Sequence, residues 1–479
     1  MKEEGRGVIR RPFERMKKPD LPDQAHVHMI GVGGAGMSGL AIVMAGLGYK
    51  ISGSDRQRVA LSSKLEKCGV SVLEGHSPSN IDEADLVVSS AAIGTDNPEL
   101  LAAREKGIPI ISRAEMLGRL MGDNFGIAIS GTHGKTTTTS MLALILEEAA
   151  LDPTVLVGGE VDKLGGNAVL GESNVFLTEA CEAFNSFLTL SPMIALVTNI
   201  DADHLDCHGS LEGVKDSFRN FLSRVREGGC AVMCGDCENT RDVIPSVREA
   251  VITYGFEDGA DLQGYDVDVS TPAPTFKVRL HGRELGEFKL EVPGWHNVLN
   301  ALGAIGVATE MEIDPSVIRA GLLNFTGAGR RFELLGEGQG IVVIDDYAHH
   351  PAEVAATLSA ARSWGRRIVS VFQPHLYSRT KIFAADFADA LLHADMAFVM
   401  EVYAAREAPM PGVSGAMIAD RMNEITPGKA EFAPDRDQLV ERILSVLHEG
   451  DMLLVMGAGD IRSIGEAVLD RLQVGNDYV

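Results

Sequence analysis

A glycine-rich segment near the end of the first third of the chain carries the most specific chemistry in the sequence. It reads GIAISGTHGKTTTTSM over residues 126–141, where an apolar run leads into glycines, a lysine and threonines. Loops of this type bind nucleotide phosphates through backbone N–H groups, a lysine and a hydroxyl that ligates Mg²⁺. The loop is two residues shorter than the common form G-x-x-x-x-G-K-[ST]. We predict an ATP site whose phosphates contact Gly131, Thr132, His133, Gly134, Lys135, Thr136 and Thr137.

Acidic groups and a histidine follow two later strand-like runs. NVFLTEACE brings Glu179 to the end of one run, and MIALVTNIDADHLD brings Asp201, Asp203, His204 and Asp206 past the end of another. Ligands of open parallel sheets gather beyond the carboxyl ends of the strands. Carboxylate and imidazole groups at that edge can complete a Mg²⁺ shell or orient a reactant. We therefore expect Glu179 and His204 to act beside the ATP phosphates.

A second glycine pattern lies nearer the N-terminus. HMIGVGGAGMSGLAIVM has the spacing G-x-G-x-x-G between a strand-like run and a helix-like run, which suits a nucleotide diphosphate. An acid about 20 residues further on commonly contacts a ribose. This motif alone fits NAD as well as a UDP-sugar. Its candidate contacts are Gly31, Gly33, Gly34, Ala35, Gly36, Ser54 and Asp55.

Polar residues also recur at strand ends in the last third of the chain. IVVIDDYAHHPAEV ends in Tyr347 and His349, and VSVFQPHLYSRTKIF ends in His375 and Arg379. Upstream, FTGAGRRFELLG places Arg330 and Arg331 at a domain junction, where arginines can meet phosphate when domains close. The recurrence at one end of successive strands predicts a third binding edge.

Three cycles of alternating strand and helix patterns must position these groups. We predict an α/β protein with a flexible arm over 1–24, a Rossmann-like parallel sheet over 25–123, a central P-loop ATPase domain over 124–328 and a C-terminal Rossmann-like domain over 329–479. The stretch STPAPTFKVRLHGRELGEFKLEVPG predicts added antiparallel strands in the central domain.

Charge and composition exclude several classes of protein. The net charge of −24 argues against a nucleic-acid partner, since phosphate backbones need basic surface. No apolar run approaches the ~20 residues that span a bilayer, so we expect no membrane insertion. Six cysteines and an N-terminus without a signal-like apolar segment favour a cytoplasmic location.

A series of motifs, in order along residues 26–465, resembles the Mur ligases. They are GVGGAGMSG, SGSD, NPE, SRAEMLGRLM, GTHGKTTTTSM, EACE, TNIDADHLD, PGWHNVLNA, RRFE, DDYAHHP and FQPHLYSR. The resemblance implies a UDP-sugar domain, an ATPase domain and an amino-acid domain. It also implies phosphate contacts for Lys135 and Arg331, Mg²⁺ ligation by Thr136, Glu179 and His204, and adenine contacts for His296 and Asn297. Tyr347, His349, His375 and Arg379 would surround the amino acid.

The resemblance implies an ATP-dependent ligase that joins L-alanine to UDP-N-acetylmuramate through an acyl phosphate. Lys135 and Arg331 would stabilise charge, and His204 or His349 would take the proton of the amine. A ligase for a recycled tripeptide, an NAD-dependent dehydrogenase and a non-catalytic nucleotide-binding protein remain alternatives. The chain departs from the family pattern at Cys181, where aspartate is frequent, and at Trp295, where a basic residue is common. Arg219 stands near the position of a carbamylated lysine in related ligases.

Overall fold

Three sheets, each with its own covering helices, organise the chain. The computed structural model describes residues 13–56, 62–203, 205–405 and 407–474. The chain divides into two compact units, each described by itself. The first contains the chain up to Asp266 together with Phe276–Lys289 and Leu299–Phe325, and the second contains Val267–Thr275, Leu290–Val298 and the chain from Thr326 onward. The predicted boundaries of three domains stay a prediction.

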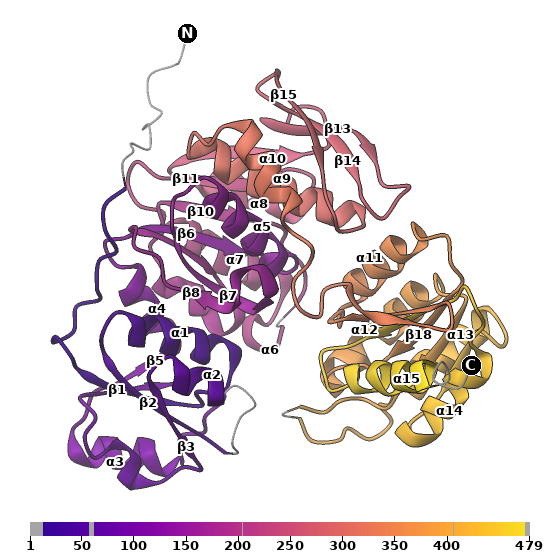
Figure 1. Cartoon of the computed structure of the whole chain (residues 1–479), viewed down its shortest axis with the longest axis horizontal. Helices are drawn as coiled ribbons and strands as arrows, with labels where there is room; N and C mark the ends of the chain where they lie inside the picture. Colours follow the sequence, from indigo (N-terminus) through magenta and orange to yellow (C-terminus); the bar gives the residue numbers. More distant parts are fainter. Residues whose placement is uncertain (1–12, 57–61, 204, 406, 475–479) are drawn as a thin grey trace. The chain divides into compact units, whose positions relative to one another are not determined.

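The first sheet is entirely parallel, as predicted. Its strands are β1 (His26–Ile30), β2 (Lys50–Asp55), β3 (Val70–Glu74), β4 (Leu86–Ser89) and β5 (Ile110–Ser112), in the order β3-β2-β1-β4-β5. The connecting helices are α1 (Ala35–Gly46), α2 (Ser62–Lys67), the short η1 (Pro78–Ile81), α3 (Pro98–Lys106) and α4 (Arg113–Met121) (Figure 1). Val27 and Met29 of β1 share a core with α1, and Ile30 shares another with α3.

The second sheet has ten strands in the order β15-β14-β13-β12-β11-β10-β6-β9-β7-β8. They are β6 (Phe125–Ser130), β7 (Thr154–Val161), β8 (Gly166–Val169), β9 (Val175–Glu179), β10 (Ile194–Val197), β11 (Cys230–Cys234), β12 (Ala250–Gly255), β13 (Leu262–Asp268), β14 (Thr275–Leu280) and β15 (Arg283–Lys289). Strands β7, β9, β6, β10, β11 and β12 run parallel, and β8 pairs antiparallel with β7. The Pro- and Gly-bearing stretch therefore extends the sheet as β14 and β15.

Helices of the central part follow the strands of this sheet. They are α5 (Lys135–Glu148), η2 (Asp162–Leu164), η3 (Ala183–Thr189), α6 (Leu205–His208), α7 (Leu211–Leu222), α8 (Glu238–Val243), η4 (Ile244–Ser246), α9 (Trp295–Glu310) and α10 (Pro315–Leu323). Helix α5 is buried along most of its length and packs against α10, where Gly321 permits a close approach to the backbone of Ile145. Burial of α5 fixes the phosphate loop at its N-terminus.

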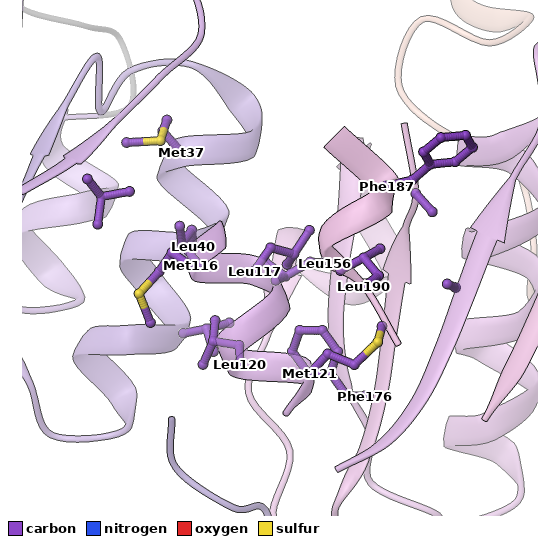
Figure 2. Close-up of a cluster of buried hydrophobic side chains, with 14 of the residues drawn as sticks. Met37, Leu40, Met116, Leu117, Leu120, Met121, Leu156, Phe176, Phe187 and Leu190 are labelled. Carbon is purple, nitrogen blue, oxygen red and sulfur yellow. The ribbon is translucent and has the colours of Figure 1, made fainter. Parts of the chain in front are cut away.

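The first and second sheets are joined by a shared hydrophobic core. Figure 2 shows side chains of α1 and α4 meeting side chains of β7, β9 and η3 in one cluster. Its labelled members are Met37, Leu40, Met116, Leu117, Leu120, Met121, Leu156, Phe176, Phe187 and Leu190. A hydrogen bond of 2.6 Å from Asn167 Nδ2 in β8 to the carbonyl of Ala35 adds a polar contact to the same junction. The two sheets therefore belong to one packed body.

The described half of the N-terminal arm makes contacts with this body, and its predicted flexibility stays a prediction. Its backbone bonds with Glu172 and Asn174, and the ring of Phe13 meets that of Phe125 edge-on at 5.2 Å. Lys17 and Asn124 exchange two hydrogen bonds of 2.8 and 2.9 Å. Local charge did not reveal these contacts, because their partners lie more than 100 residues away in the sequence. Residues 1–12 of the arm lie outside the described residues.

The third sheet has the order β16-β17-β21-β18-β19-β20. Its strands are β16 (Glu333–Gly338), β17 (Ile341–Asp346), β18 (Ile368–Phe372), β19 (Met396–Val399), β20 (Ala430–Phe432) and β21 (Met452–Met456). Only β16 is antiparallel among these described pairs. Separate hydrophobic clusters cover the two faces of the sheet. The helices are α11 (Pro351–Arg362), α12 (Tyr377–Leu391), α13 (Ala416–Ile425), α14 (Arg436–Val446) and α15 (Arg462–Val474).

This arrangement confirms the predicted fold class of three α/β regions with parallel N-terminal strands, a mixed central sheet and a Rossmann-like C-terminal part. Within the described parts of the chain, no helix is both long and apolar enough to cross a membrane.

Candidate active site

The predicted phosphate loop connects β6 to α5 and depends on two glycines. Gly131 has φ +137° and Gly134 has φ +81°, values that residues with a Cβ rarely adopt. A Cβ at Gly131 would clash with Thr198, and one at Gly134 would clash with the amide of Asn300 in α9. No side chain caps the start of α5 at Gly134, so its first N–H groups face the loop. The loop has the backbone form that phosphate binding needs.

Residues just past β10 hold this loop in shape. The N–H of Thr132 donates to the carbonyl of Asn199 at 3.0 Å, and the N–H of His133 donates to the Asn199 side chain at 2.8 Å. In return, the N–H of Asp201 donates to Oγ1 of Thr132 at 2.9 Å. Asn199 and Asp201 thus support the loop from the neighbouring strand. Asn199 was not among the predicted site residues, although it ends an apolar run in the sequence.

Lys135, the first residue of α5, forms an ion pair with Glu182. Its Nζ lies 3.0 Å from a carboxylate oxygen of Glu182 and donates to the carbonyl of Thr132 at 3.1 Å. The Glu182 side chain is only 2% exposed. Burial lowers the pKa of Lys135, but the negative groups around it, of which Glu182 has the largest effect, together outweigh burial and the pKa is raised. Lys135 is therefore a fixed cation at the phosphate loop.

Glu179 and Thr136 converge on the backbone of β7. The N–H of Gly158 donates to Glu179 at 2.7 Å, and a Cβ at Gly158 would lie 2.6 Å from the other carboxylate oxygen. A Cβ at the next residue, Gly159, would lie 3.4 Å from Cγ2 of Thr136. The absence of side chains at these two glycines thus leaves space beside the Glu179 carboxylate and the Thr136 side chain, two residues that carry the hard oxygen donors that Mg²⁺ prefers. His204, predicted with them, lies outside the described residues.

The G-x-G-x-x-G motif forms a tight turn between β1 and α1. The N–H groups of Gly31 and Val32 donate to the carbonyl of Ser54, and the N–H of Gly33 donates to Asp55 Oδ2 at 3.0 Å. Asp55 therefore stabilises the turn in this structure, and its predicted contact with a ribose stays a prediction. Helix α1 begins at Ala35 without a side-chain cap at Gly34.

The third glycine of the motif brings a cation to the same turn. A Cβ at Gly36 would lie 3.0 Å from Nη1 of Arg113, the first residue of α4. A guanidinium beside the N-terminus of α1 suits a diphosphate, because both the helix end and the side chain are positive. Sequence reasoning missed Arg113, since 77 positions separate it from Gly36 and only tertiary packing joins them.

The second unit gathers the four predicted amino-acid residues. The rings of Tyr347 and His349 lie 5.4 Å apart, those of His349 and His375 lie 6.0 Å apart, and Nη1 of Arg379 lies 3.4 Å from Nδ1 of His375. Tyr403 stacks on His375 at 5.9 Å. The carboxyl ends of β17 and β18 thus bring polar rings and a cation together, as the sequence predicted, and add Tyr403, which it did not.

Arg330 and Arg331 make different contacts. Arg330 bonds with buried Asp345 at 3.0 Å and donates to the carbonyls of Gly457 and Gly459. Arg331 contacts the Tyr347 ring at 5.2 Å and lies 3.9 Å from Glu353. Arg330 therefore ties β17 to the end of β21. Arg331 has the looser contacts, which suits it for binding a ligand.

Asp346 connects the two loops of this cluster. It accepts hydrogen bonds from the N–H groups of Phe332 and Ala348 at 2.7 and 2.8 Å, and from Thr357 at 3.2 Å. Burial raises the pKa of Asp346 to about 6. Because Phe332 follows Arg331 and Ala348 precedes His349, this one carboxyl group holds both functional residues in place.

Glu353 and His349 form a second local pair. Nδ1 of His349 lies 2.9 Å from the carbonyl of Tyr347 and 3.2 Å from Glu353, whose carboxylate also accepts the N–H groups of His349 and His350 at the start of α11. Burial lowers the pKa of His349, against the opposing charge of Glu353. His349 is therefore neutral near pH 7 and able to accept a proton. The spacing H-H-P-A-E, a capping signature, could have revealed Glu353.

His296 and Asn297 open helix α9 in the second unit. Burial, followed by the charge of Arg331, lowers the pKa of His296 to about 4. Asn297 donates from Nδ2 to the carbonyl of Pro293 at 2.7 Å. A neutral imidazole suits contact with a base better than a charged one, and the predicted adenine contact stays a prediction.

Comparison with known families decides between the classes of protein that could use this site. The Mur ligase family catalytic domain matches residues 26–124, the Mur ligase middle domain matches 129–308, and the Mur ligase glutamate ligase domain matches 330–459. Together these matches cover most of the chain. The chain is a Mur ligase.

Relatives of this Mur ligase share its full length. It is 45% identical over 448 residues to a UDP-N-acetylmuramate–L-alanine ligase of Geotalea daltonii, covering 93% of this chain and 98% of that one. It is 46% identical to the protein of the same name from Solidesulfovibrio magneticus, covering 93% and 97%. Among solved structures, a UDP-N-acetylmuramate–alanine ligase of Thermotoga maritima has a TM-score of 0.81 at 30% identity, covering 94% and 100%. A murein peptide ligase of Psychrobacter arcticus has a TM-score of 0.70 at 26% identity, covering 94% and 99%.

This Mur ligase departs from the family pattern at three positions, and the structure shows what surrounds two of them. Cys181 is half-buried near the Lys135–Glu182 pair, and burial raises the pKa of its thiol, so a neutral group replaces the frequent aspartate. Arg219 pairs with Glu212 and Asp216 on α7 at 2.6 and 2.5 Å. Trp295 begins α9 with 47% of its side chain exposed, and nothing in the structure explains why tryptophan stands there.

Proposed function

We propose that this Mur ligase joins L-alanine to the lactoyl carboxylate of UDP-N-acetylmuramate at the expense of ATP. The support is the identity of 45–46% over nearly full length to relatives named for that reaction. The observation that carries the chemistry is the phosphate loop with a lysine held by an ion pair at the first turn of α5. Because the reaction consumes ATP, we place it in the cytoplasm.

The reaction proceeds in two steps. A carboxylate oxygen of the sugar nucleotide attacks the γ-phosphorus of ATP, the bond to the bridging oxygen breaks, and ADP leaves with an acyl phosphate formed. The amine of L-alanine then attacks the acyl carbon, the C–O bond to phosphate breaks, and inorganic phosphate leaves. The amide product is UDP-N-acetylmuramoyl-L-alanine, and a base takes one proton from the amine.

Charge stabilisation supplies most of the catalysis of the first step, as in other phosphoryl transfers. Lys135 neutralises the β- and γ-phosphates, and the N–H groups from Gly131 to Thr137 surround them. Arg331 binds the transferred phosphoryl group. Thr136 and Glu179 would hold Mg²⁺, which supplies Lewis-acid polarisation of the phosphates when bound.

His349 is the base we favour for the second step. Its Nδ1–H donates to the carbonyl of Tyr347 at 2.9 Å, so Nε2 carries the lone pair. Its lowered pKa keeps it neutral at the pH at which the amine must lose a proton. Arg379 and His375 of the same cluster bind the carboxylate of the amino acid, and Tyr347 packs against its short side chain.

A coupled assay of ADP release tests the proposal. The intact protein is mixed with ATP, Mg²⁺ and UDP-N-acetylmuramate, and L-alanine, L-serine, glycine and the tripeptide L-alanyl-γ-D-glutamyl-diaminopimelate are added separately. We expect the highest kcat/KM with L-alanine. A higher kcat/KM with the tripeptide would replace the proposal by the tripeptide ligase, and no ADP release with any amine would remove it.

The lysine assignment has its own control. We expect Lys135→Ala to lower kcat by two to three orders of magnitude, about 2–4 kcal/mol of barrier, as when one charge-stabilising donor is lost. Lys67→Ala, an exposed lysine of α2, serves as the matched control and should leave kcat unchanged. Unchanged turnover of Lys135→Ala would contradict the catalytic role of the loop.

A further inference from the structure

A group of polar side chains fills the face of the first sheet that α3 and η1 cover. Alternate residues of β1 and β2 turn His28 and Ser54 toward this face, and both are fully buried. Glu99, in the first turn of α3, is also fully buried, and Asn80 of η1 lies beside it. An ionisable carboxyl group with no exposed surface is rare unless its neighbours stabilise it.

Glu99 is the centre of the group. Its Oε2 accepts a hydrogen bond from Ser54 Oγ at 2.6 Å and lies 2.9 Å from Nδ1 of His76. Its Oε1 accepts from Asn80 Nδ2 at 2.6 Å and lies 3.5 Å from Nε2 of His28. Residues of β1, β2, η1 and the loop after β3 therefore direct their polar atoms at one carboxyl group.

The carboxyl group is ionised near pH 7. Burial raises its pKa, but the hydrogen bonds from Ser54 and Asn80 and the nearby ring of His28 together outweigh burial, and the pKa of Glu99 falls to about 2. An ionised carboxylate only accepts hydrogen bonds, so each neighbour must donate to it. Nδ1 of His76 therefore carries a proton that points inward, and Nε2 is the ring atom left for a ligand.

His76 lies at the edge where the glycine-rich turn lies. It follows the end of β3 by two residues, and the N–H of Gly75 donates to the carbonyl of Asp55, the last residue of β2. The carbonyl of Ser54 accepts the N–H groups of Gly31 and Val32 in the turn itself. The His76 side chain is 13% exposed, whereas Ser54 and Glu99 are closed to solvent. His76 is thus the member of the group that a ligand at this edge can reach.

We propose that Glu99 is a positioning residue of the sugar-nucleotide site, which orients His76 so that its Nε2 accepts a hydrogen bond from an N–H or O–H group of the uridine. The inference rests on the proposed function, because it assumes a uridine nucleotide at the turn between β1 and α1. Carboxylates that fix the tautomer of a histidine in this way act through the second ring nitrogen.

Binding of UDP to the intact protein, measured by calorimetry, tests the proposal without the ligase reaction. We expect Glu99→Gln to weaken UDP binding on the order of tenfold, the lower end of the effect of losing a carboxylate behind a functional histidine. In the assay, KM for the sugar nucleotide should rise while kcat and KM for ATP stay unchanged. Glu83→Gln is the control, because Glu83 lies on the same domain with 76% of its side chain exposed and should bind UDP as the unaltered protein does.

A second variant separates orientation from folding. His76→Asn keeps an N–H donor for Glu99 but lacks the acceptor Nε2, and it changes a residue at the surface edge. We expect it to weaken UDP binding as much as Glu99→Gln does, and the double variant to bind no more weakly than either. In ¹⁵N spectra of histidine, the His76 ring should show a protonated Nδ1 in the unaltered protein and a changed tautomer population in Glu99→Gln.

The outcomes distinguish this inference from the function it rests on. Unaltered UDP affinity in both variants, with ligase activity intact, overturns the role of Glu99 and His76 alone. Additive losses in the double variant, with a lowered melting temperature in each, also overturn it, because they indicate a structural role. Absence of UDP binding and of ligation in the unaltered protein overturns the proposed function.

Discussion

The ammonium group of Lys135 and the carboxylate of Glu182 form an ion pair of 3.0 Å at the first turn of α5. The side chain of Glu182 is almost completely buried, and that of Lys135 is 15% exposed. The pair holds the phosphate-binding cation ready before any phosphate is bound. It also means that removal of the lysine has two effects, one on catalysis and one on folding.

We predict that these two effects can be separated. Lys135→Ala leaves the Glu182 charge buried without its partner, so the free energy of unfolding should fall by about 3 kcal/mol. Adding Glu182→Gln removes that charge and should restore most of the stability, while kcat stays as low as in Lys135→Ala. Urea unfolding followed by circular dichroism measures the first quantity and ADP release the second. Recovery of turnover in the double variant would contradict the assignment of Lys135.

The second prediction concerns the backbone of the loop. Gly134→Ala must adopt φ near +81° and displace the Asn300 amide, so we expect ATP binding to weaken at least tenfold through about 1–2 kcal/mol of backbone strain and the added clash. Gly228→Ala is the matched control, because Gly228 has φ +77° but open space where the Cβ would lie. Calorimetric titration with a non-hydrolysable ATP analogue measures both.

Equal losses of affinity in Gly134→Ala and Gly228→Ala would show that a general effect on folding explains them. Loss of ATP affinity in Gly134→Ala alone supports direct contact between the loop and the nucleotide.

The third prediction follows from His296. Its pKa is about 4 in the folded chain and about 6.5 when unfolded, so the unfolded chain binds more protons between these values. The contribution of neutral His296 to the free energy of unfolding is therefore complete above pH 6.5 and is lost as the pH falls toward 4. Between pH 7 and pH 5 the unaltered protein should lose about 1–2 kcal/mol more than His296→Gln does.

Urea midpoints at the two pH values check this difference. His448→Gln, whose side chain is 74% exposed, provides the control and should follow the unaltered protein. The same pH dependence in His296→Gln and in the unaltered protein would rule out a neutral, buried His296.

The phosphate loop and the glycine-rich turn between β1 and α1 could be found from the sequence because each is a local pattern. A strand, a turn and a helix follow one another within about 20 residues, and Glu179 ends a strand that pairs directly with β6. Apolar strand-like runs followed by polar residues likewise predicted that Tyr347, His349, His375 and Arg379 lie at strand ends. The structure brings these four residues into one cluster within the second unit.

The partners that hold these residues were not found, because tertiary packing brings them together. Glu182 lies 47 residues from Lys135 in sequence, and Arg113 lies far from Gly36. Glu99 is a charged residue at the start of a predicted helix, so the sequence alone suggests an exposed side chain. In the fold it is buried. The contacts of the N-terminal arm with Asn124 and Glu172 were not found for the same reason.

The last prediction concerns this arm. Asn124 is 1% exposed between α4 and β6, where its side chain bonds with the N–H and carbonyl of Lys17 and with the carbonyl of Leu120. Asn124→Ala leaves three backbone groups without that partner, so the free energy of unfolding should fall by about 2 kcal/mol. Asp123→Ala, at the exposed neighbouring position, is the control and should change it by less than about 0.5 kcal/mol.

Removal of the arm should have a matching effect. Once residues 1–24 are deleted, Lys17 no longer bonds with Asn124, so Asn124→Ala should destabilise the shortened chain less than the full chain. Urea unfolding of the four proteins gives the coupling between the two changes as a double-mutant cycle. Equal effects of Asn124→Ala in the full and shortened chains would show that Asn124 stabilises the fold independently of the arm, through its bond with Leu120.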